Sequence, residues 1–141
     1  MLPKALKYIV VVLLTANGLF FMANIAVLGD TPGAVAMHED LAPWAGPLMA
    51  QLKVVVCFLT GAAYAAAAAG LVLGRRGLVL AGPAGAALFL GFYAVELVLW
   101  GGSHAMVWLG FAIFGTLALV LGAACLQAAR GPGIPKEADA S

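Results

Sequence analysis

The sequence predicts an all-α integral membrane protein folded as an antiparallel bundle of four transmembrane helices. Of the 141 residues, 65% are hydrophobic and only 9% are charged, whereas about a quarter of the residues in a typical soluble domain carry a charge. The mean hydropathy is +1.08. The apolar residues gather into four runs, each long enough to cross the roughly 30 Å hydrocarbon core of a bilayer as a helix.

The first expected span covers residues 8–28, a run of 21 residues without a charge. Lys4 and Lys7 precede it, as basic residues precede the apolar core of a secretory signal peptide. Because this run is longer than such a core and lacks a small-x-small cleavage site, we expect a retained helix. Residues 29–47 follow as an external loop, since they contain three prolines and three acidic residues.

The second expected span, residues 48–73, is rich in alanine and ends at the Gly-Arg-Arg-Gly sequence of residues 74–77, which predicts a tight turn. The third span covers residues 78–100. Its Gly82-Pro83 pair predicts a kink near the start of the helix, where neighbouring helices satisfy the freed backbone groups.

A short turn at residues 101–104 leads to the fourth expected span, residues 105–128. Residues 1–130 therefore form one membrane domain. Residues 131–141 are rich in glycine, proline and charge, which predicts a disordered cytoplasmic tail.

The positive-inside rule predicts that both termini are cytoplasmic. The loops on the opposite side carry acidic residues and no lysine or arginine. The absence of organelle-targeting features favours a bacterial inner membrane. The basic residues that share the inner side are Lys4, Lys7, Arg75, Arg76 and Arg130.

Small residues recur every fourth position in the second span, as at Gly61, Ala65 and Ala69. Such spacing lets helix backbones approach closely in lipid, where hydrophobic burial does not drive association. It predicts a tightly packed bundle, with a homodimer face as the alternative. Membrane lipid and a larger membrane complex are further expected partners, whereas nucleic acid is not, because Arg75-Arg76 is the largest basic cluster.

Lys53 and Glu96 are the two charged residues inside the expected spans. By helical rise each lies roughly 6–8 Å below the outer interface. A charge in hydrocarbon is costly and normally finds a partner inside the bundle, so the sequence predicts a Lys53–Glu96 ion pair. The alternative is that Lys53 extends to the headgroups and leaves the carboxyl group alone.

Helical spacing brings other polar side chains toward this pair. Cys57, Thr60 and Tyr64 follow Lys53 along one face of the second span, and Asn17 and Asn24 share a face of the first. One interpretation is structural, with amide and hydroxyl groups satisfying a buried ion pair. The other is a cavity that binds a proton or a ligand. The candidate residues are Lys53, Glu96, Asn24, Tyr93, Thr60 and Tyr64.

The external segments offer a second candidate site, for a copper or zinc ion. His38 and His104 each lie near a methionine, Met37 and Met106, and imidazole and thioether groups are ligands for these metals. The spacing fixes no coordination geometry, so ordinary loop residues are the alternative. The sequence requires no cofactor and contains no catalytic or nucleotide-binding motif, which favours a protein that is not an enzyme.

The stretch from Lys53 to Tyr93 resembles the DoxX-like group of small four-helix bacterial membrane proteins. The resemblance covers about a third of the chain and rests on Leu-Lys-Val-Val at the start of the second span, Gly-Leu-Val-Leu-Gly near its end and the Arg-Arg turn. It implies an inner-membrane bundle, associated in some members with quinone-linked sulfur oxidation or a partner oxidoreductase. Lys53 is the position carried over, whereas Glu96 has no counterpart in the family pattern.

Three functions follow as expectations. The first is a non-catalytic accessory or assembly subunit of a larger membrane complex. The second is a small carrier or ligand-binding bundle that uses Lys53 and Glu96. The third is a quinone-linked or metal-linked redox subunit. A carrier of four spans is expected to dimerise, because one copy leaves little room for an alternating site.

Overall fold

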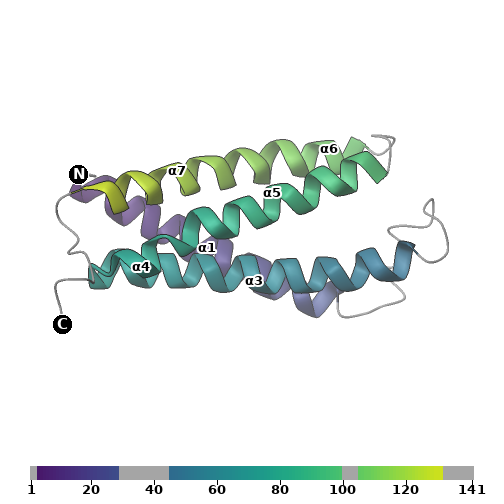
Figure 1. Cartoon of the computed structure of the whole chain (residues 1–141), viewed down its shortest axis with the longest axis horizontal. Helices are drawn as coiled ribbons and strands as arrows, with labels where there is room; N and C mark the ends of the chain where they lie inside the picture. The colour runs from purple at the N-terminus through teal and green to yellow at the C-terminus, as the bar shows by residue number, and fades with distance from the viewer. Residues whose placement is uncertain (1–2, 29–44, 100–104, 132–141) are drawn as a thin grey trace.

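The computed structural model describes residues 3–28, 45–99 and 105–131, which are almost entirely helical. Figure 1 shows the long helical rods of the chain lying side by side. Each rod contains a segment long and apolar enough to cross a membrane, so four helices with the length and hydropathy expected of spans are present in the described residues. The elements are α1 (Lys4–Leu28), α3 (Ala45–Leu73), α4 (Arg76–Val79), α5 (Ala81–Leu99), α6 (Ala105–Gly110), the π-helix η1 (Phe111–Gly115) and α7 (Thr116–Arg130).

The helices extend slightly beyond the expected spans. The loop expected over residues 29–47 is too long by three residues, because α3 begins at Ala45 and includes Pro47. A proline in the first turn of a helix costs nothing, since its missing N–H has no partner there in any case. The expected turn at 101–104 and tail residues 132–141 lie outside the described residues, while α7 continues to Arg130.

The connection between α3 and α4 is shorter than the four-residue turn that the sequence predicts. Gly74 adopts a positive φ of 70°, and the backbone N–H of Arg75 donates to the carbonyl of Gly70 at 2.9 Å. This is the hydrogen bond of a glycine-terminated helix end. It completes the turn at Arg75, so Arg76 and Gly77 already belong to α4.

The third rod is interrupted at Leu80, between α4 and α5. Pro83 follows three residues later and cannot donate to the carbonyl of Val79, with which its ring would clash in a continuous helix. The interruption therefore lies at the end of the span where the sequence predicts a kink. The π-helix η1 in the fourth rod is a feature that the hydropathy pattern does not predict.

Glycine and alanine lie where the rods approach one another. A Cβ atom added to Gly18 of α1 would be 3.1 Å from the carbonyl oxygen of Gly61 on α3. On the other side of α3, a Cβ on Gly85 of α5 would be 2.8 Å from that of Ala63. These contacts agree with the close packing predicted from small-residue spacing.

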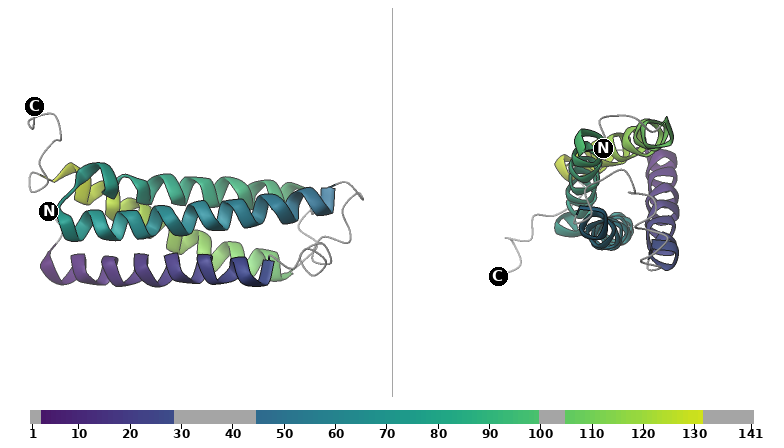
Figure 2. Two further views of the ribbon diagram at one scale, coloured as in Figure 1. Left: turned by 90° about the horizontal axis from the view of Figure 1, so that it is seen from below. Right: turned by 90° about the vertical axis from the view of Figure 1, so that its right-hand side faces the viewer.

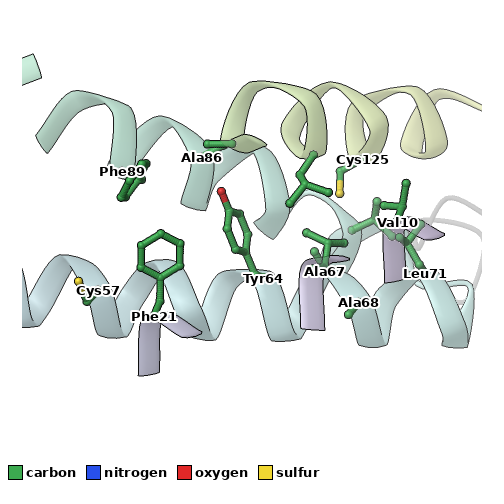
Figure 3. Packing of buried hydrophobic residues seen from close by; sticks show 14 of the residues in the cluster. Val10, Phe21, Cys57, Tyr64, Ala67, Ala68, Leu71, Ala86, Phe89 and Cys125 are labelled. Atoms are coloured by element: carbon green, nitrogen blue, oxygen red, sulfur yellow. The ribbon is translucent and has the colours of Figure 1, made fainter. Parts of the chain in front are cut away.

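Buried residues from all four rods form one core. Figure 3 shows Tyr64 of α3 pointing toward Ala86 of α5, with Phe21 and Phe89 on one side of it and Ala67 and Cys125 on the other. The outward faces are apolar as well, since Val98 is 80% exposed and Leu119 is 61% exposed. A rod that is apolar on every side suits a lipid environment.

Candidate functional site

The Lys53–Glu96 ion pair predicted from the sequence is present. Lys53 Nζ donates a hydrogen bond to Glu96 Oε1 at 2.8 Å, joining α3 to α5. The two side chains differ in burial, because 17% of the Lys53 side chain is exposed and only 1% of Glu96. Glu96 thus lies within the protein, and Lys53 stands between it and an open space.

That open space is a partly open cavity of about 450 Å³ lined by α1, α3, α5 and the α6–η1 segment. Its size lies within the range typical of small-molecule sites. Lys53 contributes the one charged side chain to its lining within the described part of the chain. The thirteen lining residues are Phe20, Phe21, Asn24, Lys53, Val56, Cys57, Phe89, Phe92, Tyr93, Leu109, Gly110, Ile113 and Phe114.

Tyr93 and Asn24 add further polar atoms to the cavity wall. The ring of Tyr93 has its centroid 5.7 Å from Lys53 Nζ, a distance at which an ammonium group is attracted to an aromatic face. Its hydroxyl group faces Gly110, where an added Cβ would lie 3.7 Å away. Asn24 donates from Nδ2 to the carbonyl of Phe20 in its own helix at 2.8 Å, which fixes its orientation.

Aromatic rings from three of the rods form much of the remaining wall. Phe20 of α1 and Phe114 of η1 stack with centroids 5.1 Å apart and an interplanar angle of 14°. Phe21 meets Phe89 of α5 at 5.0 Å with an angle of 63°. Such edge and face contacts order the rings and leave a rigid apolar surface.

The π-helix η1 contributes to this wall. Phe111, its first residue, stacks on Tyr93 with centroids 6.3 Å apart, and Phe114 turns toward Phe20 and Phe21. A π-turn adds one residue to the helical repeat and is often found at functional sites. Phe114 lines the cavity, whereas Phe111 packs on Tyr93 and is not part of the lining.

Thr60 and Tyr64 face the interior, as predicted, but they lie outside the cavity lining. Both are buried, and neither Thr60 Oγ1 nor Tyr64 OH has a hydrogen-bond partner within the described residues. The interpretation in which these hydroxyls satisfy the ion pair is therefore wrong. The reason is depth, since they follow Lys53 on α3 by seven and eleven positions, or about 10 and 16 Å of helical rise.

Asn17 also fails to join the polar centre. Its Nδ2 donates to the carbonyl of Leu13 at 2.8 Å, one turn earlier in α1. An asparagine whose amide bonds to its own helix satisfies one donor locally and needs no partner across the bundle. Of the polar residues singled out in α1, Asn24 alone reaches the cavity.

The metal-site candidates lie beyond what the structure describes. His38, His104 and Met37 are outside the described residues, and for Met106 only the backbone in α6 is described. Among described residues, no group of three or more histidine, cysteine or acidic side chains is placed to hold a metal ion. The proposed copper or zinc site therefore stays a prediction.

Sequence reasoning missed the aromatic part of the site. Phenylalanine is common on lipid-facing surfaces, so its presence in an apolar run indicates little. The sequence does contain a positional signal. Phe92 and Phe89 precede Glu96 by one and two helical turns. Phe20 and Phe21 each precede Asn24 by about one helical turn. Residues so spaced share a face with the polar centre.

No family model matches the chain, and neither does a curated protein or a solved structure. The DoxX-like resemblance therefore stays a prediction based on residues of the second and third spans. The geometry of the cavity and the ion pair is therefore the basis for inferring a function.

Proposed function

We propose that this protein is a four-span integral membrane protein that binds a small lipid-soluble molecule in the cavity beside Lys53. One observation carries the proposal. A cavity of about 450 Å³ has six aromatic rings in its lining and the ammonium group of a buried ion pair at one point. Ligand sites are commonly apolar spaces with a few fixed polar groups, which provide orientation and specificity.

The proposed topology is an antiparallel bundle with both termini on the cytoplasmic side of a bacterial inner membrane. Contacts between α3 and α5 support the antiparallel arrangement. Residue numbers rise along α5 where they fall along α3, since Gly82 lies against Ala67 and Gly85 against Ala63. Figure 2 shows α1 and α3 side by side, with their colours running in opposite directions. The positive-inside rule then puts the Lys53–Glu96 end of the bundle on the outer side.

A matched pair of glycine substitutions tests ligand binding. Gly110 lines the cavity, and an added Cβ there has atoms of Tyr93 alone within 4 Å, so Gly110→Phe places a ring in the space. Gly91 is exposed on α5 with nothing within 4 Å of an added Cβ, so Gly91→Phe is the control.

The measurement is native mass spectrometry of the full chain, extracted from its membrane with the surrounding lipid. We expect a small molecule to accompany the wild type and Gly91→Phe and to be absent from Gly110→Phe. Equal small-molecule content in all three proteins, or none in any, would overturn the proposal.

The accessory-subunit function stays a prediction, as does the redox alternative. A surface groove of about 250 Å³ between α1 and α3 is lined mainly by small and aliphatic residues such as Gly18, Ala65 and Ala69. Grooves of this kind accept a neighbouring helix in lipid. Nothing in the structure identifies an occupant.

A further inference from the structure

The cavity carries almost no net charge within the described residues. Lys53 is the one charged residue in its lining, and the Glu96 carboxylate lies 2.8 Å from Lys53 Nζ. The ion pair as a whole is neutral. A charged ligand would bring an uncompensated charge into a low-dielectric space, which is unfavourable.

Hydrogen-bond donors predominate at the polar end of the cavity. A lysine ammonium group has three donors and no acceptor, and one donor of Lys53 is directed at Glu96. The hydroxyl group of Tyr93 and the amide of Asn24 lie in the same lining. A ligand that offers an acceptor oxygen can therefore be bound here without a charge of its own.

The rest of the wall favours a planar ring. Stacked and edge-on contacts already order Phe20 against Phe114 and Phe21 against Phe89. A ligand ring can continue this arrangement, in which positive ring edges meet negative ring faces. The volume of about 450 Å³ is enough for one or two rings with a small substituent.

The exposed rim of the cavity is apolar. Leu109 and Ile113 are each 54% exposed on the α6–η1 side, and Phe20 is 45% exposed on α1. In the proposed four-span topology these side chains face the hydrocarbon of the bilayer. A ligand that reaches the cavity past them must be soluble in lipid.

We infer that the ligand is an uncharged, lipid-soluble aromatic carbonyl compound, whose oxygen accepts a hydrogen bond from Lys53 while its ring packs against the phenylalanine wall. This inference rests on the proposed function and adds the chemical class of the ligand. Glu96 acts in it as a positioning residue, because it holds the ammonium group at the wall and cancels its charge.

Benzophenone is a direct probe, because it is a neutral diaryl ketone that cross-links to nearby C–H bonds when irradiated. Two charged relatives share its chromophore: 4-benzoylbenzoate is an anion and (4-benzoylbenzyl)trimethylammonium is a cation. The full chain in lipid nanodiscs is irradiated with each, and adducts are located by mass spectrometry. Labelling of the cavity residues Leu109 and Ile113 is divided by labelling of Leu119, which is exposed away from the cavity, to correct for partitioning into the bilayer.

We expect benzophenone to label the cavity residues in preference to Leu119, and both charged relatives to show a lower ratio. Diphenylmethane has the two rings without the carbonyl. As a competitor of cavity labelling by isotopically labelled benzophenone, we expect it to be roughly tenfold weaker than unlabelled benzophenone, because it lacks one hydrogen bond to a charged donor. That difference should shrink in the neutral double variant Lys53→Met/Glu96→Gln, while the labelling positions stay the same.

Two contrary outcomes are distinguishable. Preferential cavity labelling by the anion or the cation, or equal competition by diphenylmethane, overturns the inferred ligand class and leaves the proposed binding function in place. The second outcome is that none of the three compounds labels the cavity above the level of Leu119, and that Gly110→Phe and Gly91→Phe carry the same small-molecule content. This outcome overturns both the ligand class and the proposed binding function.

Discussion

Lys53 and Glu96 share a 2.8 Å hydrogen bond but not the same environment, because Lys53 lies at the cavity wall and Glu96 is enclosed behind it. This asymmetry has an energetic consequence. If the lysine is lost, a carboxylate with 1% exposure loses the ammonium group beside it and gains no access to water. If the carboxylate is lost, the ammonium group still has the cavity and the face of Tyr93 beside it.

We therefore predict that Lys53→Met destabilises the protein more than Glu96→Gln does. Removal of one partner from a buried ion pair typically costs about 3–5 kcal/mol, and we expect Lys53→Met to lie in that range. The double variant should recover most of the loss, since it leaves no buried charge. Thermal unfolding of the four proteins in one detergent measures the cycle. Equal losses for both single variants would contradict the asymmetry.

The buried hydroxyl groups of Thr60 and Tyr64 give a prediction of the opposite sign. Neither has a hydrogen-bond partner within the described residues, so each carries the cost of desolvation without a compensating bond. Thr60→Val and Tyr64→Phe keep the shapes of the side chains, and we expect both variants to be as stable as the wild type or up to about 1–3 kcal/mol more stable. Thermal unfolding is the measurement, and a clear loss of stability in either variant would show that its hydroxyl group is bonded.

The ion pair could be predicted from the sequence because its two residues carry unambiguous signals. A charge inside an apolar run is rare, and two such charges at equal depth on neighbouring helices indicate a pair. The helical period places Thr60 and Tyr64 correctly on the inner face, but it does not show that their hydroxyl groups lie too far along α3 to reach the ion pair. Periodicity gives the face of a helix, whereas position along the helix decides which residues meet.

The four helices were equally accessible to prediction, because length and hydropathy determine them. The π-helix η1 was not, since no residue type in its Phe-Ala-Ile-Phe-Gly sequence requires the extra residue in the turn. Its position depends on packing against Tyr93 and Phe20 across the bundle. The aromatic wall of the cavity depends on the same long-range contacts, which a single sequence does not reveal.

The end of α3 offers a test of helix packing. A Cβ on Gly70 would lie 2.7 Å from the backbone nitrogen of Val79, and backbone atoms in α4 cannot move aside as a flexible side chain can. We predict that Gly70→Ala destabilises the protein by about 1–3 kcal/mol, as overpacking usually does. Gly91→Ala is the matched control, because its Cβ meets nothing within 4 Å and should be neutral or slightly stabilising. Thermal unfolding of the two variants in the same detergent should separate them, and similar melting temperatures would argue against the close approach of α3 and α4.

The two cysteines report on access to the cavity. Both are buried free thiols, but Cys57 is 7% exposed and lines the cavity, whereas Cys125 has no exposed surface and lies against Gly82, where an added Cβ would be 2.7 Å from its Sγ. We predict that N-ethylmaleimide modifies Cys57 at least several-fold faster than Cys125 in lipid nanodiscs, because the reagent can reach Cys57 without opening the core.

The ring added by Gly110→Phe should slow the reaction of Cys57 and leave Cys125 unchanged, and Gly91→Phe should change neither rate. Mass spectrometry of the two cysteine peptides over time gives both rates from one sample, so Cys125 is an internal reference for general unfolding. Equal rates in the wild type would mean that reagent reaches both thiols by opening of the bundle, and the cavity would then not be an accessible site.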